Sequence, residues 1–246
     1  MKFVEYGTQN KEVIILLHGG GLSWWNYREE AELLQEDYHV ILPVLDGHAG
    51  SDKDFVSIKE NALQLIAYID EYCGGSVIFI GGLSLGAQIL LEILAQRKDI
   101  CRYALIESAL VIPMWITHYL VKPMVDMSHG LIKKKWFSKL QFKSLHVKEE
   151  LYEDYYKDSV GITKENMISF LRGNSSYKVN EEIRNTNAKV HILVGQKESY
   201  KMRRSAEKLN MMMPESILEV LDGMYHGEIS LNCAQKYVEM VKKIVK

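Results

Sequence analysis

The sequence predicts an α/β fold: a doubly wound, mostly parallel sheet flanked by helices, with a helical insertion in its second half. Short apolar runs alternate with helical patterns along most of the chain, which is typical of a parallel sheet covered by helices. Between residues 112 and 179 this alternation stops and helical pieces take over. We therefore predict a core of residues 1–111 and 180–246 and a helical cap of residues 112–179.

The first half of the chain supplies most of the expected sheet. The run over residues 13–18 is almost continuously apolar, as expected of a strand buried on both faces. The segment 58–72 carries apolar residues on one face of a helix. In chain order the expected elements are a strand over 13–18, a helix over 31–38, a strand over 39–44, a helix over 58–72, a strand over 77–82, a helix over 87–97 and a strand over 102–108.

The predicted cap is rich in Met, Trp, Tyr and Phe. Its helical pieces are expected to break at Pro113, Pro123, Gly130, Gly161 and Gly173. Such an insertion would cover the carboxyl edge of the sheet, where open α/β sheets bind ligands. After it, the pattern resumes with a strand over 190–195, a helix over 201–212, a strand over 217–223 and a helix over 234–246.

Composition limits the possible function classes. The 246 residues suffice for one large domain with an insertion, and the net charge of −2 gives no indication of a nucleic-acid partner. No apolar run reaches the length of a membrane span, and the N-terminus lacks the features of a signal peptide. Cys73, Cys101 and Cys233 are widely spaced and odd in number, so we expect reduced cysteines, no metal site and a cytoplasmic protein.

One short motif carries the chemistry. Gly82-Leu83-Ser84-Leu85-Gly86 matches G-x-S-x-G between an apolar strand and an amphipathic helix, a context that displays the serine on a sharp turn. The alternative is a serine that only caps a helix. With this motif in its context, the chain resembles the α/β-hydrolase superfamily, in particular its capped serine esterases and lipases, over almost its whole length.

The resemblance implies a set of catalytic residues. Ser84 would be the nucleophile, His226 after the last strand the base, and Glu198 after the strand 190–195 the acid, with Asp222 as the rival acid. The glycine run after the first long strand would form the oxyanion hole through the N–H of Gly20 or Gly21 together with that of Leu85. We expect His18 and Asp46 to have structural roles.

Aromatic and sulfur-containing side chains are candidates for the substrate pocket. Trp24 and Trp25 follow the glycine run, and Met114 and Trp115 begin the predicted cap. Each could instead be packed in a core. The segment Lys133–Phe137 could contact an anionic membrane surface, but a solvated helix turn is favoured.

The predicted function is therefore a serine hydrolase for carboxylic esters of small to medium, largely apolar substrates, with a Ser-His-Glu triad and no metal or organic cofactor. The same triad serves thioesterases, monoglyceride lipases and C–C bond hydrolases, and the fold also hosts ligand-binding proteins without catalysis. Epoxide and haloalkane hydrolases are disfavoured because they carry Asp where this chain has Ser84.

Overall fold

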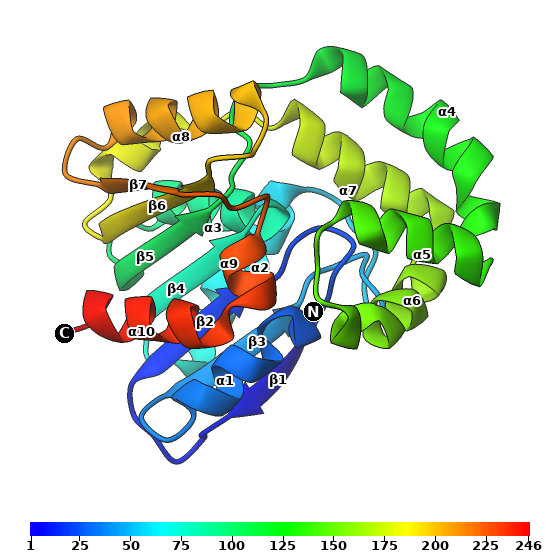
Figure 1. Ribbon diagram of the computed structural model, residues 1–246. Coiled ribbons are helices and arrows are strands. Elements are labelled where there is room, and N and C mark those ends of the chain that lie inside the picture. The colour runs from blue at the N-terminus through cyan, green and yellow to red at the C-terminus, as the bar shows by residue number, and fades with distance from the viewer.

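The structure, a computed structural model that describes residues 1–246, is built on a seven-stranded sheet (Figure 1). The strand order is β1-β3-β2-β4-β5-β6-β7, and only the pair β1–β3 is antiparallel. The strands are β1 (Lys2–Tyr6), β2 (Val13–Leu17), β3 (His39–Val44), β4 (Val77–Leu83), β5 (Cys101–Glu107), β6 (Lys189–Gly195) and β7 (Ile217–Leu221). The predicted fold class is thereby confirmed, and of the seven strands only the edge strand β1 was missed.

Helices cover both faces of the sheet (Figure 1). Apolar residues of α2, α3 and α8 join one buried cluster, whereas those of α1 and α10 join a second cluster on the opposite face. The helices are α1 (Arg28–Leu34), α2 (Ile58–Tyr72), α3 (Leu85–Gln96), α4 (Trp115–Ile132), α5 (Lys135–Ser144), α6 (Tyr152–Gly161), α7 (Lys164–Ser176), α8 (Tyr200–Met212), α9 (Glu228–Asn232) and α10 (Ala234–Ile244), with short 3-10 helices η1 (Trp24–Tyr27), η2 (Glu149–Leu151) and η3 (Glu181–Asn185).

The winding of the sheet determines where a ligand can bind. From β2 the chain first moves outward to β3 and then returns past β2 to β4. The loops that leave the carboxyl ends of β2 and β4 therefore diverge, and a crevice opens between them. These loops contain the glycine run and Ser84, respectively.

The segment between β5 and β6 is helical, but its breaks differ from the prediction. Helix α4 continues through Pro123 and Gly130, and α7 continues through Gly173. Pro123 lies on the exposed side of α4, while its neighbours Val121 and Val125 are buried. We attribute the continuity of α4 to this packing, which outweighs the loss of one backbone hydrogen bond at the proline.

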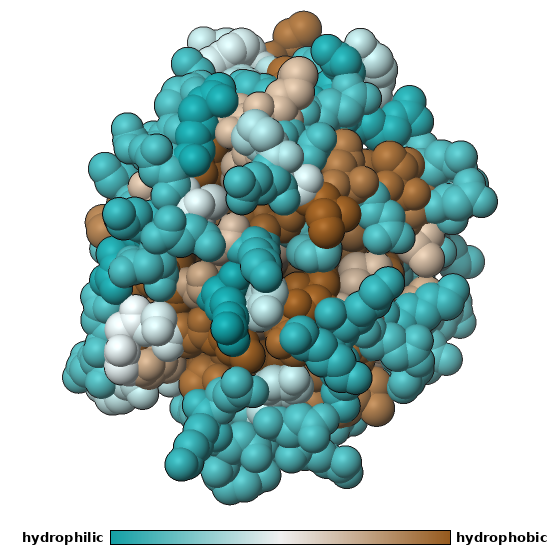
Figure 2. All heavy atoms as spheres, turned by 90° about the vertical axis from the view of Figure 1, so that its left-hand side faces the viewer, coloured by the Kyte–Doolittle hydropathy of each residue, from teal (hydrophilic) through white to brown (hydrophobic).

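The β7 edge of the sheet exposes apolar side chains. Figure 2 shows this side of the molecule, with brown hydrophobic surface surrounded by teal hydrophilic residues. Ile217 and Val220 of β7 and Met211 of α8 are exposed. No helix of the structure is both long and apolar enough to span a bilayer.

Candidate active site

Ser84 occupies a sharp turn between β4 and α3. Its backbone has φ 53° and ψ −109°, a conformation that a residue with a side chain rarely adopts. The flanking glycines are required by close backbone contacts. A Cβ on Gly82 would lie 2.7 Å from the backbone of Gly86, and a Cβ on Gly86 would lie 2.2 Å from the carbonyl oxygen of Leu17. The turn thus holds the Ser84 side chain at the N-terminus of α3, where a developing negative charge is favoured.

His226 and Glu198 form a hydrogen-bonded pair. The Nδ1–H of His226, in the loop after β7, donates to Oε2 of Glu198 at 2.6 Å. The other carboxylate oxygen of Glu198 accepts hydrogen bonds from the Ser108 hydroxyl (2.7 Å) and from the Gly195 N–H (2.8 Å). Burial would raise the pKa of Glu198, but these three hydrogen bonds and the charge of His226 lower it below its ordinary value. Glu198 is therefore held as a carboxylate.

The rival acid is not in this network. Asp222 is exposed on the loop after β7 and forms no hydrogen bond with His226. The side chain of Glu198 is only 1% exposed, whereas that of His226 is 44% exposed and borders the same cavity as Ser84. The Ser84 hydroxyl and the His226 ring do not form a direct hydrogen bond. Such bonds often tighten only when substrate is bound.

The backbone N–H groups of Gly20 and Gly21, in the glycine run after β2, differ in their hydrogen bonding. The Gly21 N–H donates to Nε2 of His48 at 3.0 Å, so it already has an acceptor. The Gly20 N–H has no acceptor in the protein, and Gly20 lies beside Leu85. Burial lowers the pKa of His48 to about 4, which keeps the ring neutral and able to accept this bond at Nε2. Its Nδ1–H then donates to the Asp46 carbonyl at 3.1 Å.

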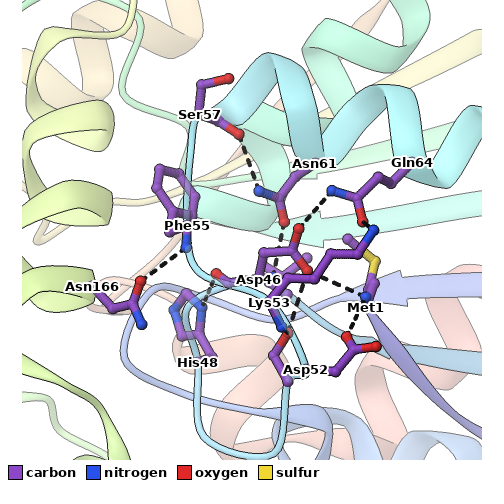
Figure 3. A network of polar contacts seen from close by, with 12 residues as sticks. Met1, Asp46, His48, Asp52, Lys53, Phe55, Ser57, Asn61, Gln64 and Asn166 are labelled. Carbon is purple, nitrogen blue, oxygen red and sulfur yellow. Dashed lines mark hydrogen bonds and ion pairs between the residues drawn. The ribbon is translucent and has the colours of Figure 1, made fainter.

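His18 and Asp46 brace the same loops. The His18 ring accepts the Leu45 N–H at 3.1 Å and donates to the Gly19 carbonyl at 2.8 Å. Figure 3 shows the Asp46 carboxylate facing Gln64 and the Met1 ammonium group. The distances from Asp46 are 2.6 Å to the Gln64 amide nitrogen and 3.4 Å to the Met1 nitrogen.

A cavity of about 760 Å³ lies above Ser84 and His226. Its walls are mainly apolar, and helix α4 contributes one side of it. The apolar lining from α4 consists of Val121, Met124, Val125 and Ile132. This volume and lining are typical of a site for a small, largely apolar molecule.

The four predicted pocket residues do not line this cavity, and that prediction is wrong. Trp25 is buried in the core, where its indole N–H donates to Asp158 at 2.8 Å. Trp24 packs under the guanidinium group of Arg28. Met114 and Trp115 lie at the start of α4, and the Trp115 side chain faces solvent. These residues were predicted to line the pocket from their position along the chain. In the structure, the orientation of the helical segments directs their side chains away from the cavity.

Two polar residues at the end of β5 were missed by sequence reasoning. Ser108 has a left-handed backbone (φ 56°) and supports Glu198, as described above. Glu107 is fully buried, and burial raises its pKa to about 7. The sequence signal that could have identified them is that two adjacent polar residues lie at the carboxyl end of strand β5, which pairs with β6. No cluster of three or more His, Cys, Asp or Glu side chains is arranged to hold a metal ion.

Comparison with known proteins agrees with this fold. The model of the alpha/beta hydrolase family matches residues 14–237, so the chain belongs to that family. Family and fold together support a hydrolase activity.

Similar solved structures include a thermophilic esterase from Thermogutta terrifontis, with 16% identity and a TM-score of 0.81 over 100% of this chain and 94% of that one. MenH from S. aureus has 19% identity and a TM-score of 0.77 over 99% and 97% of the two chains. A carboxylesterase structure from Nitrososphaera gargenis has 17% identity and a TM-score of 0.80 over 99% and 94%. No match is found among curated proteins. At these identities the structural likeness establishes the fold.

Proposed function

We propose that this protein is a serine hydrolase that cleaves carboxylic esters of small to medium, largely apolar substrates. The observation that carries the proposal is the Glu198–His226 hydrogen bond beside the cavity that also contains Ser84. A buried carboxylate that orients an imidazole toward a serine on a strained turn is the arrangement that activates a nucleophile.

The chemistry follows in two steps. The Ser84 oxygen would attack the ester carbonyl while its proton passes to Nε2 of His226. The imidazolium returns this proton to the departing alkoxide, which leaves as the alcohol and gives an acyl-Ser84 intermediate. A water molecule then attacks the acyl carbon, again losing a proton to His226. The carboxylic acid is released and the proton returns to the Ser84 oxygen. Glu198 would stabilise the imidazolium in both steps.

For the oxyanion hole we propose the N–H groups of Gly20 and Leu85. The first N–H groups of a helix have no partner within it, and Leu85 is the first residue of α3. Gly20 is favoured over Gly21 because the Gly21 N–H is already bonded to His48. Losing one such donor typically costs on the order of 3 kcal/mol of transition-state stabilisation.

We further propose that residues 112–179 act as the cap that encloses the substrate. Side chains of α4, α5, α6 and α7 line the cavity, and most of those from α4 are apolar. This wall would bind an apolar acyl or alcohol group. A cytoplasmic location is also part of the proposal. It is supported by the three cysteines, Cys73, Cys101 and Cys233, which are free thiols.

The test combines an activity-based probe with a series of esters. A fluorophosphonate probe should label Ser84, and Ser84→Ala should abolish both labelling and the turnover of p-nitrophenyl butyrate. Ser128→Ala is the matched control, because Ser128 lines the same cavity but bonds only to the Met124 carbonyl. Labelling that persists in Ser84→Ala would overturn the assignment of the nucleophile. Parallel acyl thioesters of graded length separate esterase from thioesterase activity.

A further inference from the structure

Helix α4 exposes apolar side chains on the face that turns away from the protein. Ile116 is 78% exposed and Met127 is 82% exposed, although both are large apolar residues. They belong to one stripe along the helix, because residues spaced by three, four or seven positions share a helix face. The exposed apolar residues of this stripe are Ile116, Tyr119, Leu120, Met127 and Leu131.

Helix α5 continues the exposed apolar surface. Trp136 is 65% exposed, and Leu140 lies one turn further along the same face. The opposite face of α5 is buried through Ser138 and Phe142. Below, the exposed stripe of α4 together with Trp136 and Leu140 is called the α4–α5 surface.

The charges around the α4–α5 surface are mainly positive. Residues 115–145 contain six lysines and one acidic residue, a net charge of +5, although the whole chain carries −2. The lysines are Lys122, Lys133, Lys134, Lys135, Lys139 and Lys143, all of them exposed. The acidic residue, Asp126, pairs with Lys122 and with Lys164. Lys133, Lys134 and Lys143 form no ion pair, so their charges remain available to a partner.

The α4–α5 surface adjoins the cavity through helix α4, whose other side lines it. Three large apolar residues of the cavity lining are also exposed to solvent: Met124 on α4, Leu145 after α5 and Leu171 on α7. Helix α4 therefore carries apolar side chains both toward the cavity and toward solvent.

We propose that the α4–α5 surface docks this protein onto anionic lipid bilayers. Exposed apolar side chains, aromatic anchors and unpaired lysines on a helix that lies flat are the features that bind the interface of an anionic membrane. No helix spans a membrane, so the chain would lie on the bilayer and not cross it. The exposed apolar residues of β7 do not form a comparable surface, because the acidic residue Glu219 lies between them on the strand.

The first experiment measures binding to vesicles by co-sedimentation. Wild-type protein should bind vesicles of phosphatidylcholine with phosphatidylglycerol, and should bind vesicles of phosphatidylcholine alone much more weakly. Lys133→Glu/Lys134→Glu should lower the partition coefficient by at least roughly fivefold for each lysine. Trp136→Ser/Leu140→Ser should also lose binding, because it removes the apolar part of the interaction. Added salt should weaken the binding of the wild type.

Matched variants on another helix supply the control. Met211→Ser/Lys208→Glu on α8 removes one exposed apolar side chain and reverses the charge of one half-buried lysine, yet should bind like the wild type. Thermal unfolding of each variant confirms that it remains folded. Vesicle binding does not require ester hydrolysis, so a failure of the proposed function leaves this result interpretable.

Three outcomes would overturn the proposal. The first is the absence of binding to anionic vesicles by the folded wild type. The second is binding that neither the Lys133/Lys134 variant nor the Trp136/Leu140 variant reduces below the α8 control. The third is a dimer, detected by sedimentation velocity, that Trp136→Ser/Leu140→Ser converts to a monomer, because the surface would then be an interface between two copies of the chain.

Discussion

The hydroxyl of Ser108 donates a 2.7 Å hydrogen bond to Oε1 of Glu198, whereas His226 bonds to the other carboxylate oxygen, Oε2. Ser108 is buried and has a left-handed backbone, a conformation that costs free energy for a residue with a side chain. The fold thus maintains a strained residue at the position that supports the proposed catalytic acid. Ser108 is in this view a positioning residue that acts through Glu198.

Ser108→Ala should lower kcat by about tenfold or more, because a hydrogen bond to a buried charged group contributes roughly 1.5–3 kcal/mol. One of the bonds that lower the pKa of Glu198 is then missing, so that pKa rises. Protonation of Glu198 removes the charge that would stabilise the His226 imidazolium, so the fall of kcat/KM on the acid side should begin at a higher pH than in the wild type. Ser108→Gly is the control: it removes the same bond but relieves the backbone strain. It should share the kinetic defect and unfold at a higher temperature than Ser108→Ala.

Glu198→Gln should lower kcat by up to about four orders of magnitude, by analogy with the acids of other triads. The amide keeps the size of the side chain but removes the charge that would stabilise the His226 imidazolium. Asp222→Asn is the matched control and should leave steady-state kinetics nearly unchanged, because Asp222 is exposed and does not contact His226. The reverse pattern, a large loss for Asp222→Asn and a small one for Glu198→Gln, would refute the assignment.

His48 should position the proposed oxyanion loop without touching substrate. His48→Phe keeps the stacking on Phe170 but removes the acceptor of the Gly21 N–H. We expect kcat to fall about tenfold, less than for the loss of a whole oxyanion donor, while KM changes little. His48→Gln offers an amide oxygen to the same N–H and should recover part of the loss. If the two variants have equal kcat values, the hydrogen bond to Gly21 does not matter for the reaction.

The sheet and the serine turn could be predicted from the sequence because their signals are local. The run over 13–18 is apolar throughout, and the glycines at 82 and 86 are needed wherever backbones approach this closely. The helix α4 was harder to predict, because its continuity through Pro123 depends on residues that pack it from elsewhere in the chain.

The candidate site was only partly predictable for a related reason. The proposed roles of Ser84, His226 and Glu198 came from their order along the chain, and the structure places the three side chains around one cavity. The difference between Gly20 and Gly21 depends on a hydrogen bond to His48, which lies 27 residues further along the chain. The rotation of the helices, which excludes Trp24 and Trp115 from the cavity, is likewise set by tertiary packing and not by sequence position.

Glu107 makes the free energy of unfolding depend on pH in a direction opposite to that of most carboxylates. Burial raises its pKa to about 7, and one of its carboxylate oxygens has no hydrogen-bond partner. Between the ordinary glutamate pKa and this value, the native state holds a proton that the unfolded state has released. The contribution of Glu107 to stability is therefore fully present below the unfolded pKa and is lost as the pH rises through the folded pKa.

Glu107→Gln should remove this loss, because the amide stays neutral at every pH. Relative to the wild type, the variant should gain on the order of 3 kcal/mol in the free energy of unfolding at about pH 8, and little at about pH 5. Urea unfolding of both proteins at the two pH values measures the difference. Glu219→Gln, at an exposed position on β7, should show no such pH-dependent gain. A gain of equal size at both pH values would mean that packing, and not the titration of Glu107, separates the variant from the wild type.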